Sequence, residues 1–209
     1  MCGSSIDLGE KVTNHAKAIL HAWYPGALGG LAVAEILAGE ANPCAKLPVT
    51  IYSADNEFPD FKDYDMRGRT YRYFEGTPLY PFGYGLSYTK FAFSGAKLVA
   101  ENDEKLTVAV DVENVGAIKG KEKVQVYAQY TDSRTYTPKY QLCAIKPVEL
   151  EAGKKKTVEL EIDRYWVKAV LEDGSRVDPD GKIALFVGGS QPDELSCALT
   201  GQECLTLKV

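Results

Sequence analysis

Apolar and polar residues alternate along three segments in the second half of the chain. An apolar residue occupies every second position in residues 106–112, 124–128 and 158–162, and mostly polar residues stand between them. This period of two is typical of strands that bury one face and expose the other. The three segments therefore predict half-buried β-strands.

Further short apolar segments at residues 144–150, 183–187 and 205–209 bring the expected number of strands to six or seven. Each segment is bounded by Gly, Asp or Pro, the residues that favour turns. Many short strands separated by turns are typical of an antiparallel sandwich. We expect an all-β sandwich of the immunoglobulin or fibronectin III type over residues 95–209.

The first part of the chain shows a different pattern. Residues 16–24 form an apolar-rich run that stops at Pro25, which predicts a buried strand. Residues 29–39 have the apolar spacing of a helix that ends at Gly39. Residues 46–52 alternate again and predict a second strand. Together these segments predict the last strand-helix-strand part of an α/β sandwich domain in residues 1–52.

So few strands would leave one sheet edge and one apolar face uncovered. An isolated sheet of this size is at best marginally stable in water, and its open edge can pair with another chain. We therefore expect preceding strands outside this sequence. Without them, we expect self-association or ordering by a neighbour.

A connector rich in glycine and aromatic residues occupies residues 53–94. Gly83 and Gly85 permit turns that bulky residues resist. Rings in the same stretch can bury large areas against a neighbouring domain, and the residues concerned are Tyr80, Phe82, Tyr84 and Tyr88. The connector is therefore interpreted as a clasp between domains.

Composition narrows the function. The chain has 209 residues, of which 45% are hydrophobic and 25% charged, and its net charge is -5. A negative protein with only short basic runs gives no reason to expect binding to nucleic acid or an anionic membrane. The sequence lacks an apolar run of the roughly 18 residues needed for a membrane span, and its start does not resemble a signal peptide. A cytoplasmic location is expected.

Cysteine and histidine usage predicts neither a metal site nor a cofactor. Five cysteines are an odd number, and their spacing includes no CxxC pair. The two histidines do not complete a ligand pattern with them. We expect mostly packed thiols at Cys2, Cys44, Cys143, Cys197 and Cys204.

Several blocks stand out along the chain: residues 23–30 (Trp-Tyr-Pro-Gly-Ala-Leu-Gly-Gly), 39–43, 46–50, 65–66, 69–74, 81–88, 112–116, 120–127 and 182–190. Together, and in this order, they resemble the C-terminal region of family-three glycoside hydrolases of the β-glucosidase and β-xylosidase branch. The resemblance covers nearly the full chain. It implies the end of an α/β sandwich domain followed by a fibronectin type III-like domain.

The resemblance also implies that the catalytic pair lies elsewhere. The family uses an aspartate nucleophile on an N-terminal (β/α)8 barrel and, commonly, a glutamate acid/base upstream of the block at residues 23–30. Neither position has a counterpart in this sequence. We therefore assign no residue of the chain to catalysis, to metal binding or to cofactor binding. Five carboxylates are expected to serve as surface, capping or turn residues: Glu35, Glu40, Asp60, Asp63 and Asp65.

Three other features have a functional and a packing interpretation. Gly29 and Gly30 precede a predicted helix and could bind an anion, although the fuller phosphate-binding pattern is missing, so packing is favoured. Trp166 could be a platform for a sugar, but sealing an edge of the sandwich is favoured. Arg67, Arg69 and Arg72 are interleaved with Tyr71 and Tyr73. These side chains could contact a sugar or pack between domains, and packing is favoured.

The leading hypothesis is the C-terminal portion of a β-glycosidase that acts on terminal β-glucosides or β-xylosides. In it, these residues would complete and brace the catalytic part, and the chain alone would be inactive. The expected partner is the barrel part of the same enzyme. Two alternatives stay open: a free-standing carbohydrate-binding module, and an obligate subunit that pairs with a separately encoded barrel chain.

Overall fold

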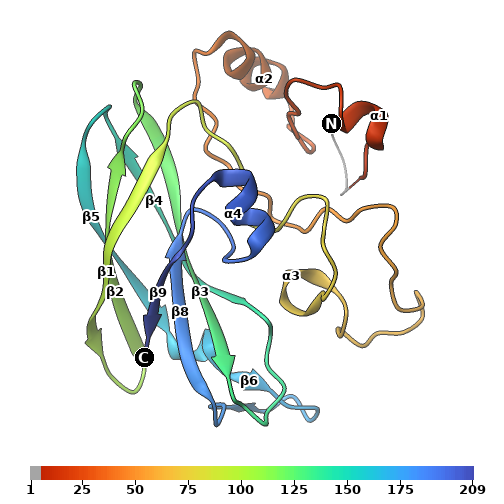
Figure 1. Cartoon of the computed structure of the whole chain (residues 1–209), viewed down its shortest axis with the longest axis vertical. Coiled ribbons are helices and arrows are strands. Elements are labelled where there is room, and N and C mark those ends of the chain that lie inside the picture. Colours follow the sequence, from red (N-terminus) through yellow and green to blue (C-terminus); the bar gives the residue numbers. More distant parts are fainter. Residues whose placement is uncertain (1–5) are drawn as a thin grey trace.

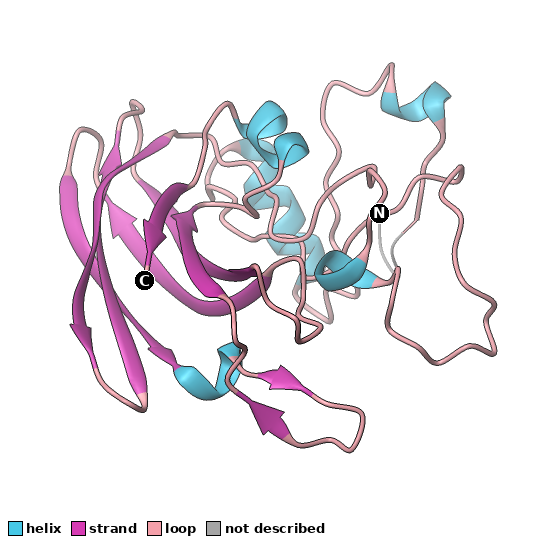
Figure 2. Ribbon diagram, turned by 60° about the horizontal axis from the view of Figure 1, so that its bottom comes forward, coloured by secondary structure: helices cyan, strands magenta, loops and turns pink. Residues whose placement is uncertain are grey.

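The computed structural model describes residues 6–209, and an antiparallel β-sandwich fills its second half (Figures 1 and 2). One sheet has three strands in the order β1-β2-β5, and the other has four in the order β4-β3-β8-β9. The strands are β1 (Phe91–Glu101), β2 (Lys105–Asn114), β3 (Gly120–Thr131), β4 (Gln141–Leu150), β5 (Lys155–Asp163), β8 (Lys182–Gly188) and β9 (Leu205–Lys208).

The predicted alternation in β2 and β5 is confirmed. In β5, Val158, Leu160 and Ile162 are buried, whereas Glu159 and Glu161 between them are exposed. The buried side chains pack against those of the facing sheet and form one core. Removal of this apolar surface from water is the main driving force for the sandwich.

Strand β3 departs from the prediction. Its apolar residues face the core as expected, but Gln125 and Tyr127 are also buried, with 1% and 0% of their surface exposed. The prediction of a half-buried strand is therefore wrong for β3. The connector covers the second face of β3. The alternation of apolar and polar residues within β3 could not predict this contact.

The sequence did not predict β1. It begins at Phe91, so the expected boundary at residue 95 falls inside it. Its pairing with β2 shifts register between Ser94 and Lys97 and again between Leu98 and Ala100. These irregularities disturb the period of two on which strand prediction depends. Six of its eleven residues are also exposed, and only Phe91 is buried.

Shorter elements complete the sandwich. A 3-10 turn, η1 (Arg164–Val167), follows β5 and leads into a hairpin of β6 (Ala169–Val170) and β7 (Arg176–Val177). Helix α4 (Glu194–Thr200) precedes β9. The Asp193 carboxylate begins α4 by accepting a hydrogen bond of 2.9 Å from the backbone N–H of Ser196.

The expected order of an α/β-type region followed by an all-β sandwich is confirmed, but the first region is only partly formed. Helix α2 (Gly29–Ala38) ends as predicted at Gly39, which has a left-handed backbone with φ of 78°. Two single-turn helices, α1 (Glu10–Thr13) and α3 (Thr70–Tyr73), lie on either side of it in the sequence. In the part of the chain that the structure describes, no helix has both the length and the apolar character to cross a membrane.

Both strands predicted to flank α2 are wrong. Residues 16–24 join no sheet among residues 6–209, and Trp23 within them has a left-handed φ of 54°. Residues 46–52 contribute only a single bridge between Ile51 and Tyr80. An extended segment becomes a strand only when another backbone satisfies its N–H and C=O groups. For residues 46–52 the connector bonds to Leu47 and Ile51, and these bonds make one bridge and not a strand ladder. Leu31 and Leu37 on α2 stay exposed.

Candidate functional site

Residues 79–89 of the connector lie between the N-terminal region and the sandwich, and we call them the clasp. On the N-terminal side the clasp forms backbone hydrogen bonds with residues 47–51. Leu47 N–H donates to Tyr84 O at 2.8 Å, Gly83 N–H donates to Leu47 O at 2.8 Å, and Ile51 N–H donates to Tyr80 O at 2.9 Å. The clasp therefore supplies backbone partners for residues 47–51.

On the sandwich side the clasp rests on the outer face of β3. Gln125 Nε2 donates hydrogen bonds to the carbonyl oxygens of Gly83 at 3.0 Å and Gly189 at 2.9 Å. Tyr127 Oη donates to Gln125 Oε1 at 2.6 Å, which fixes the orientation of the amide. Burial raises the pKa of Tyr127 well above its ordinary value, so the phenol stays neutral and can donate.

The two clasp glycines are required for different reasons. Gly83 has a φ of 77°, and a Cβ added there would lie 2.3 Å from Tyr127 Oη. The predicted turn role is confirmed for this residue. Gly85 is not among the glycines with positive φ, and a Cβ there would lie 2.3 Å from the carbonyl oxygen of Ala45. Its role is to allow two backbones to approach closely.

Aromatic rings join the clasp to the preceding helix and to β3. Phe82 stacks on Tyr71 with ring centroids 4.0 Å apart, and both rings meet Tyr127 edge-on. The Tyr71 hydroxyl accepts a hydrogen bond of 3.1 Å from Leu142 N–H, and burial raises the pKa of this tyrosine. Tyr88 does not match the burial prediction: its ring is half exposed, although its hydroxyl donates to Ile36 O at 2.8 Å.

An ion pair with little access to water ties residue 46 to the start of β3. Lys46 Nζ lies 2.9 Å from Glu122 Oε1, and the two side chains are 12% and 10% exposed. Lys46 also donates to Gly85 O at 3.1 Å, and the Glu122 carboxylate accepts from Lys123 N–H at 2.7 Å. The sequence did not predict this pair, because the two residues are far apart along the chain.

Replacing Lys46 by methionine should lower the free energy of unfolding by about 3 kcal/mol, because Glu122 would be left as an unpaired charge with little water around it. Urea denaturation of the chain measures the change. In the double variant with Glu122→Gln, much of the loss should be recovered. Lys105→Met is the matched control, because it breaks the solvent-exposed pair with Glu161 and should have a far smaller effect. Equal losses in Lys46→Met and Lys105→Met would contradict the assignment.

Asn42 connects three segments. Its Oδ1 accepts hydrogen bonds from Ser87 Oγ at 2.9 Å and Tyr88 N–H at 2.8 Å, and its Nδ2 donates to Lys119 O at 3.1 Å. A neutral amide can do this because it offers both an acceptor and donors. The N-terminal region, the clasp and the loop before β3 are therefore held by one side chain.

Asn114, at the end of β2, is fully buried and uses both ends of its amide. Its Oδ1 accepts from Thr89 Oγ1 at 2.7 Å and Gly116 N–H at 3.1 Å, and its Nδ2 donates to Ile118 O at 2.8 Å and Leu150 O at 3.0 Å. Thr89 is the last clasp residue. Asn114 therefore anchors the clasp to both sheets, a role that its place in the family-like block at residues 112–116 could have suggested.

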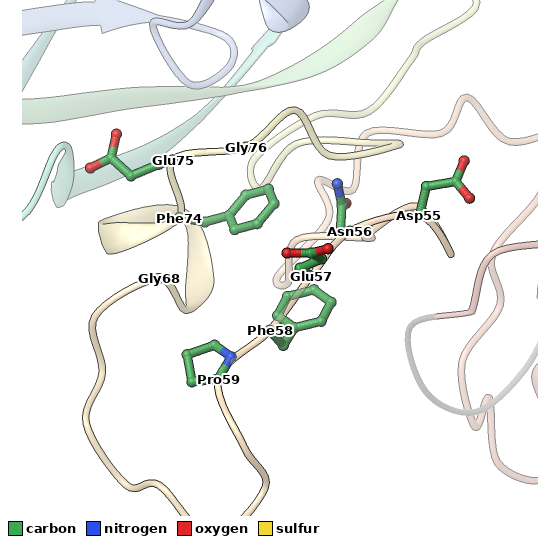
Figure 3. Close-up of a pocket in the computed structure, with 9 residues that line it drawn as sticks. All are labelled: Asp55, Asn56, Glu57, Phe58, Pro59, Gly68, Phe74, Glu75 and Gly76. Atoms are coloured by element: carbon green, nitrogen blue, oxygen red, sulfur yellow. The ribbon is translucent and has the colours of Figure 1, made fainter.

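An open pocket of about 450 Å³ lies on the N-terminal side of the clasp (Figure 3). The rings of Phe58 and Phe74 stack with centroids 5.9 Å apart, and Tyr52 meets both edge-on. The Glu57 carboxylate lies beside these rings, whereas Asp55 and Glu75 point outward in different directions (Figure 3). The three carboxylates do not converge on one point, so the pocket does not present the facing acid pair that glycoside cleavage requires.

The carboxylates expected in turns are found there. Asp60, Asp63 and Asp65 each accept a hydrogen bond from the backbone N–H two residues later, at 2.8 to 2.9 Å. This local bond is typical of aspartate in turns. Of the other two, Glu35 lies on α2 and Glu40 is exposed just after it.

The arginines of the connector have local partners. Arg69 donates to the carbonyl oxygens of Asp60 at 2.9 Å and Asp63 at 2.8 Å and closes the loop between them. Arg67 lies 5.3 Å from the centre of the Tyr136 ring. Arg72 lies 5.5 Å from the Tyr73 ring, and Tyr73 itself stacks on Tyr136 at 5.4 Å. These contacts support the packing interpretation of the segment.

The packing interpretation is supported for Gly29 and wrong for Trp166. A Cβ on Gly29 would lie 2.3 Å from Pro25 Cβ, so its packing role is supported. Trp166 does not seal the sandwich, because 53% of its surface is exposed on η1. That preferred interpretation is wrong.

The cysteines of the described part are free thiols, and Cys2 lies outside the described residues. Cys143 Sγ donates to Val126 O at 3.2 Å, and Cys204 Sγ donates to Ser190 O at 3.3 Å. Burial raises the pKa of each to about 12, so both are protonated at neutral pH. Among residues 6–209, His, Cys, Asp and Glu form no cluster that could hold a metal ion.

Comparison with known proteins decides the family. The model of the glycosyl hydrolase family 3 C-terminal domain matches residues 1–88, and that of the fibronectin type III-like domain matches residues 122–191. A xylan 1,4-β-xylosidase from Xylanibacter ruminicola is 39% identical over 197 residues, which cover 92% of this chain. A periplasmic β-glucosidase from Salmonella typhimurium is 34% identical over 197 residues and covers 85%. The chain belongs to glycosyl hydrolase family 3.

Solved structures of β-glucosidases support the family 3 assignment. One from Kluyveromyces marxianus has a TM-score of 0.77 and 31% identity over 95% of this chain. Another, from Streptomyces venezuelae in complex with D-glucose, has a TM-score of 0.76 and 30% identity over 90%. The chain spans 22% and 25% of the two curated relatives and 25% and 26% of these structures. It therefore corresponds to about a quarter of each family 3 protein, and the resemblance of its blocks to the C-terminal region is confirmed.

Proposed function

We propose that these residues brace the catalytic part of a retaining β-glycosidase that hydrolyses terminal β-glucosides or β-xylosides. The observation that carries the proposal is the clasp, which holds the N-terminal region against the sandwich by hydrogen bonds, stacked rings and the pair between Lys46 and Glu122. Such contacts fix the geometry of one region relative to another. They supply no nucleophile or proton donor.

The proposed partner is an N-terminal barrel, either in the same polypeptide or as a separate chain. Support comes from the large apolar side chains on the N-terminal side, because Leu31 and Leu37 on α2 and Phe61 and Tyr64 in the connector are exposed. A barrel packed on α2 would cover Leu31 and Leu37, as partners cover exposed apolar surface. The cytoplasmic location expected from the sequence stays a prediction, which fractionation of the source cells would test.

The purified chain should not hydrolyse aryl β-glucosides or aryl β-xylosides. Retaining cleavage needs two carboxyl groups about 5 to 5.5 Å apart on either side of the scissile bond, and we assign both to the barrel-containing part. Release of the aryl group, followed by absorbance, measures the rate. A family 3 β-glucosidase that includes its barrel is the positive control. Turnover by the chain at an enzyme-like rate would overturn the proposal.

The subunit alternative has its own test. Co-expression of the chain with a barrel encoded immediately upstream should yield a complex that hydrolyses the aryl glycoside, if the two parts are separate chains. Purification through a tag on this chain would recover the barrel. Recovery of the chain alone would exclude that arrangement.

A further inference from the structure

The turn η1 displays two aromatic side chains to solvent. Tyr165 is 48% exposed and Trp166 is 53% exposed. The neighbouring hairpin adds two partly exposed apolar residues, Val170 and Leu171. We call the surface formed by Tyr165, Trp166, Val170 and Arg176 the aromatic patch. Arg176 belongs to it because it pairs with Val170 across the hairpin and lies over Tyr165.

The turn is held by contacts that do not require either ring. The Asp163 carboxylate accepts from Tyr165 N–H at 2.8 Å. Arg164 donates from Nε to Asn102 O at 2.8 Å and forms an ion pair with Glu101. Val167 at the end of the turn is buried in the core. Exposure of the two rings is therefore a feature of a well-anchored turn and does not reflect a loosely packed loop.

The two exposed rings contact each other. Tyr165 and Trp166 meet edge to face, with centroids 5.2 Å apart and planes at 87°. The Arg176 guanidinium lies 4.1 Å from the centre of the Tyr165 ring. These contacts restrain Tyr165, which therefore has little side-chain freedom left to lose when a ligand packs on the patch.

The hairpin that carries part of the patch lies at the opposite end of the structure from α1 and α2 (Figure 1). A surface that contacts the catalytic part through α2 and the connector would leave this end of the sandwich free. The patch is therefore available for a separate role.

Charged groups of both signs surround the patch. Arg164 pairs with Glu101, and Lys168 Nζ lies 3.4 Å from Asp178 Oδ2. Arg176 contacts the Tyr165 ring, and Glu172 and Asp173 are exposed in the loop of the hairpin. Because the surface does not carry a charge of one sign, it favours neither an acidic nor a basic partner. An uncharged ligand that presents an apolar face and hydroxyl groups fits it better.

We propose that the aromatic patch binds a neutral β-linked polysaccharide. The C–H face of a pyranose ring would pack on the indole of Trp166, as apolar groups pack on exposed aromatic rings. Hydroxyl groups at the edge of the sugar could accept from the Arg176 guanidinium and donate to the Asp178 carboxylate, since these groups offer the required donors and acceptors. The site would hold a polymer near the enzyme and would take no part in bond cleavage.

This proposal rests on the bracing arrangement only for the availability of the patch, and it is tested on the whole chain, where binding is measured without a barrel. Titration with soluble xylan and with soluble cellulose fragments should give saturable binding to at least one polymer. Trp166→Ala should weaken binding about tenfold or more, as expected for removal of a central aromatic contact, and Trp166→Phe should retain part of it. The variant Trp23→Phe leaves Trp166 as the sole tryptophan, so its fluorescence reports the contact directly.

Tyr24→Ala is the matched control, because Tyr24 is 84% exposed and lies in the N-terminal region. Its binding should equal that of the unmodified chain. Circular dichroism and the thermal midpoint establish that each variant is folded. Failure of both polymers to bind would overturn the proposal, as would equal binding by Trp166→Ala. Dimerisation in sedimentation velocity that Trp166→Ala abolishes would also overturn it, because a second copy would then be the occupant.

Discussion

Replacing Gly83 by alanine should lower the free energy of unfolding by about 3 to 5 kcal/mol, because backbone strain and a steric clash act together at this position. The added Cβ would lie 2.3 Å from Tyr127 Oη and 2.6 Å from Gln125 Oε1. Both side chains are buried, so neither can move into solvent. Separation of the clasp from β3 would remove Gly83 O, one of the two acceptors of the Gln125 amide nitrogen. Denaturant unfolding followed by circular dichroism measures the loss.

Gly153→Ala separates the two causes. Gly153 also has a positive φ, of 69°, but open space surrounds the position where its Cβ would be. This control should show only the left-handed backbone cost, about 1 to 2 kcal/mol. The difference between the two variants reports the clash. If Gly83→Ala were no more destabilising than Gly153→Ala, the clasp would not be closely packed on β3.

Asn114→Asp should lower the free energy of unfolding by about 3 to 5 kcal/mol at neutral pH, a loss similar to that of Gly83→Ala. The substitution removes the Nδ2 donor that binds Ile118 O and Leu150 O and puts a carboxylate oxygen near both carbonyls. Burial would raise the pKa of the new carboxyl above its unfolded value of about 3.9. The deficit should therefore be smallest below about pH 4 and grow as the pH rises. Urea titrations between pH 3 and pH 7 would measure it.

Asn102→Asp is the control for the same chemical change at an exposed turn. Asn102 Oδ1 only accepts hydrogen bonds, from the backbone N–H groups of Glu104 at 2.9 Å and Lys105 at 2.7 Å. An aspartate can accept both. Little change in stability is expected there. A pH-independent deficit in Asn114→Asp would argue against a buried carboxylate as the cause.

Patterns that depend on near neighbours were predicted correctly. The period of two located β2, β5 and the apolar face of β3, because a strand with one face in water repeats every second residue whatever its partner. Gly39 marked the end of α2 because a left-handed residue is required there by the local backbone. The blocks that resemble family 3 likewise identified the chain's family without reference to its coordinates.

The clasp was predicted only in outline. Its glycines and aromatic rings stood out, whereas Lys46, Glu122 and Gln125 did not, because each has a partner about 40 or more residues away along the chain. A lysine or glutamine on a strand is read as solvent-exposed when the segment that covers it is unknown. Asn114 was missed for the same reason, since its amide contacts lie on other loops and strands.

The strands predicted around α2 show where an alternating pattern fails to predict a strand. Residues 16–24 and 46–52 have strand-like patterns, but pattern alone does not supply the hydrogen-bonding partner that makes a strand. The backbone beside residues 46–52 is the connector, and this contact also buries the second face of β3. Local periodicity thus specified which side chains are apolar and on which face they lie. Long-range contacts, which place distant segments side by side, decided which strands pair. The same contacts decided which polar groups are buried.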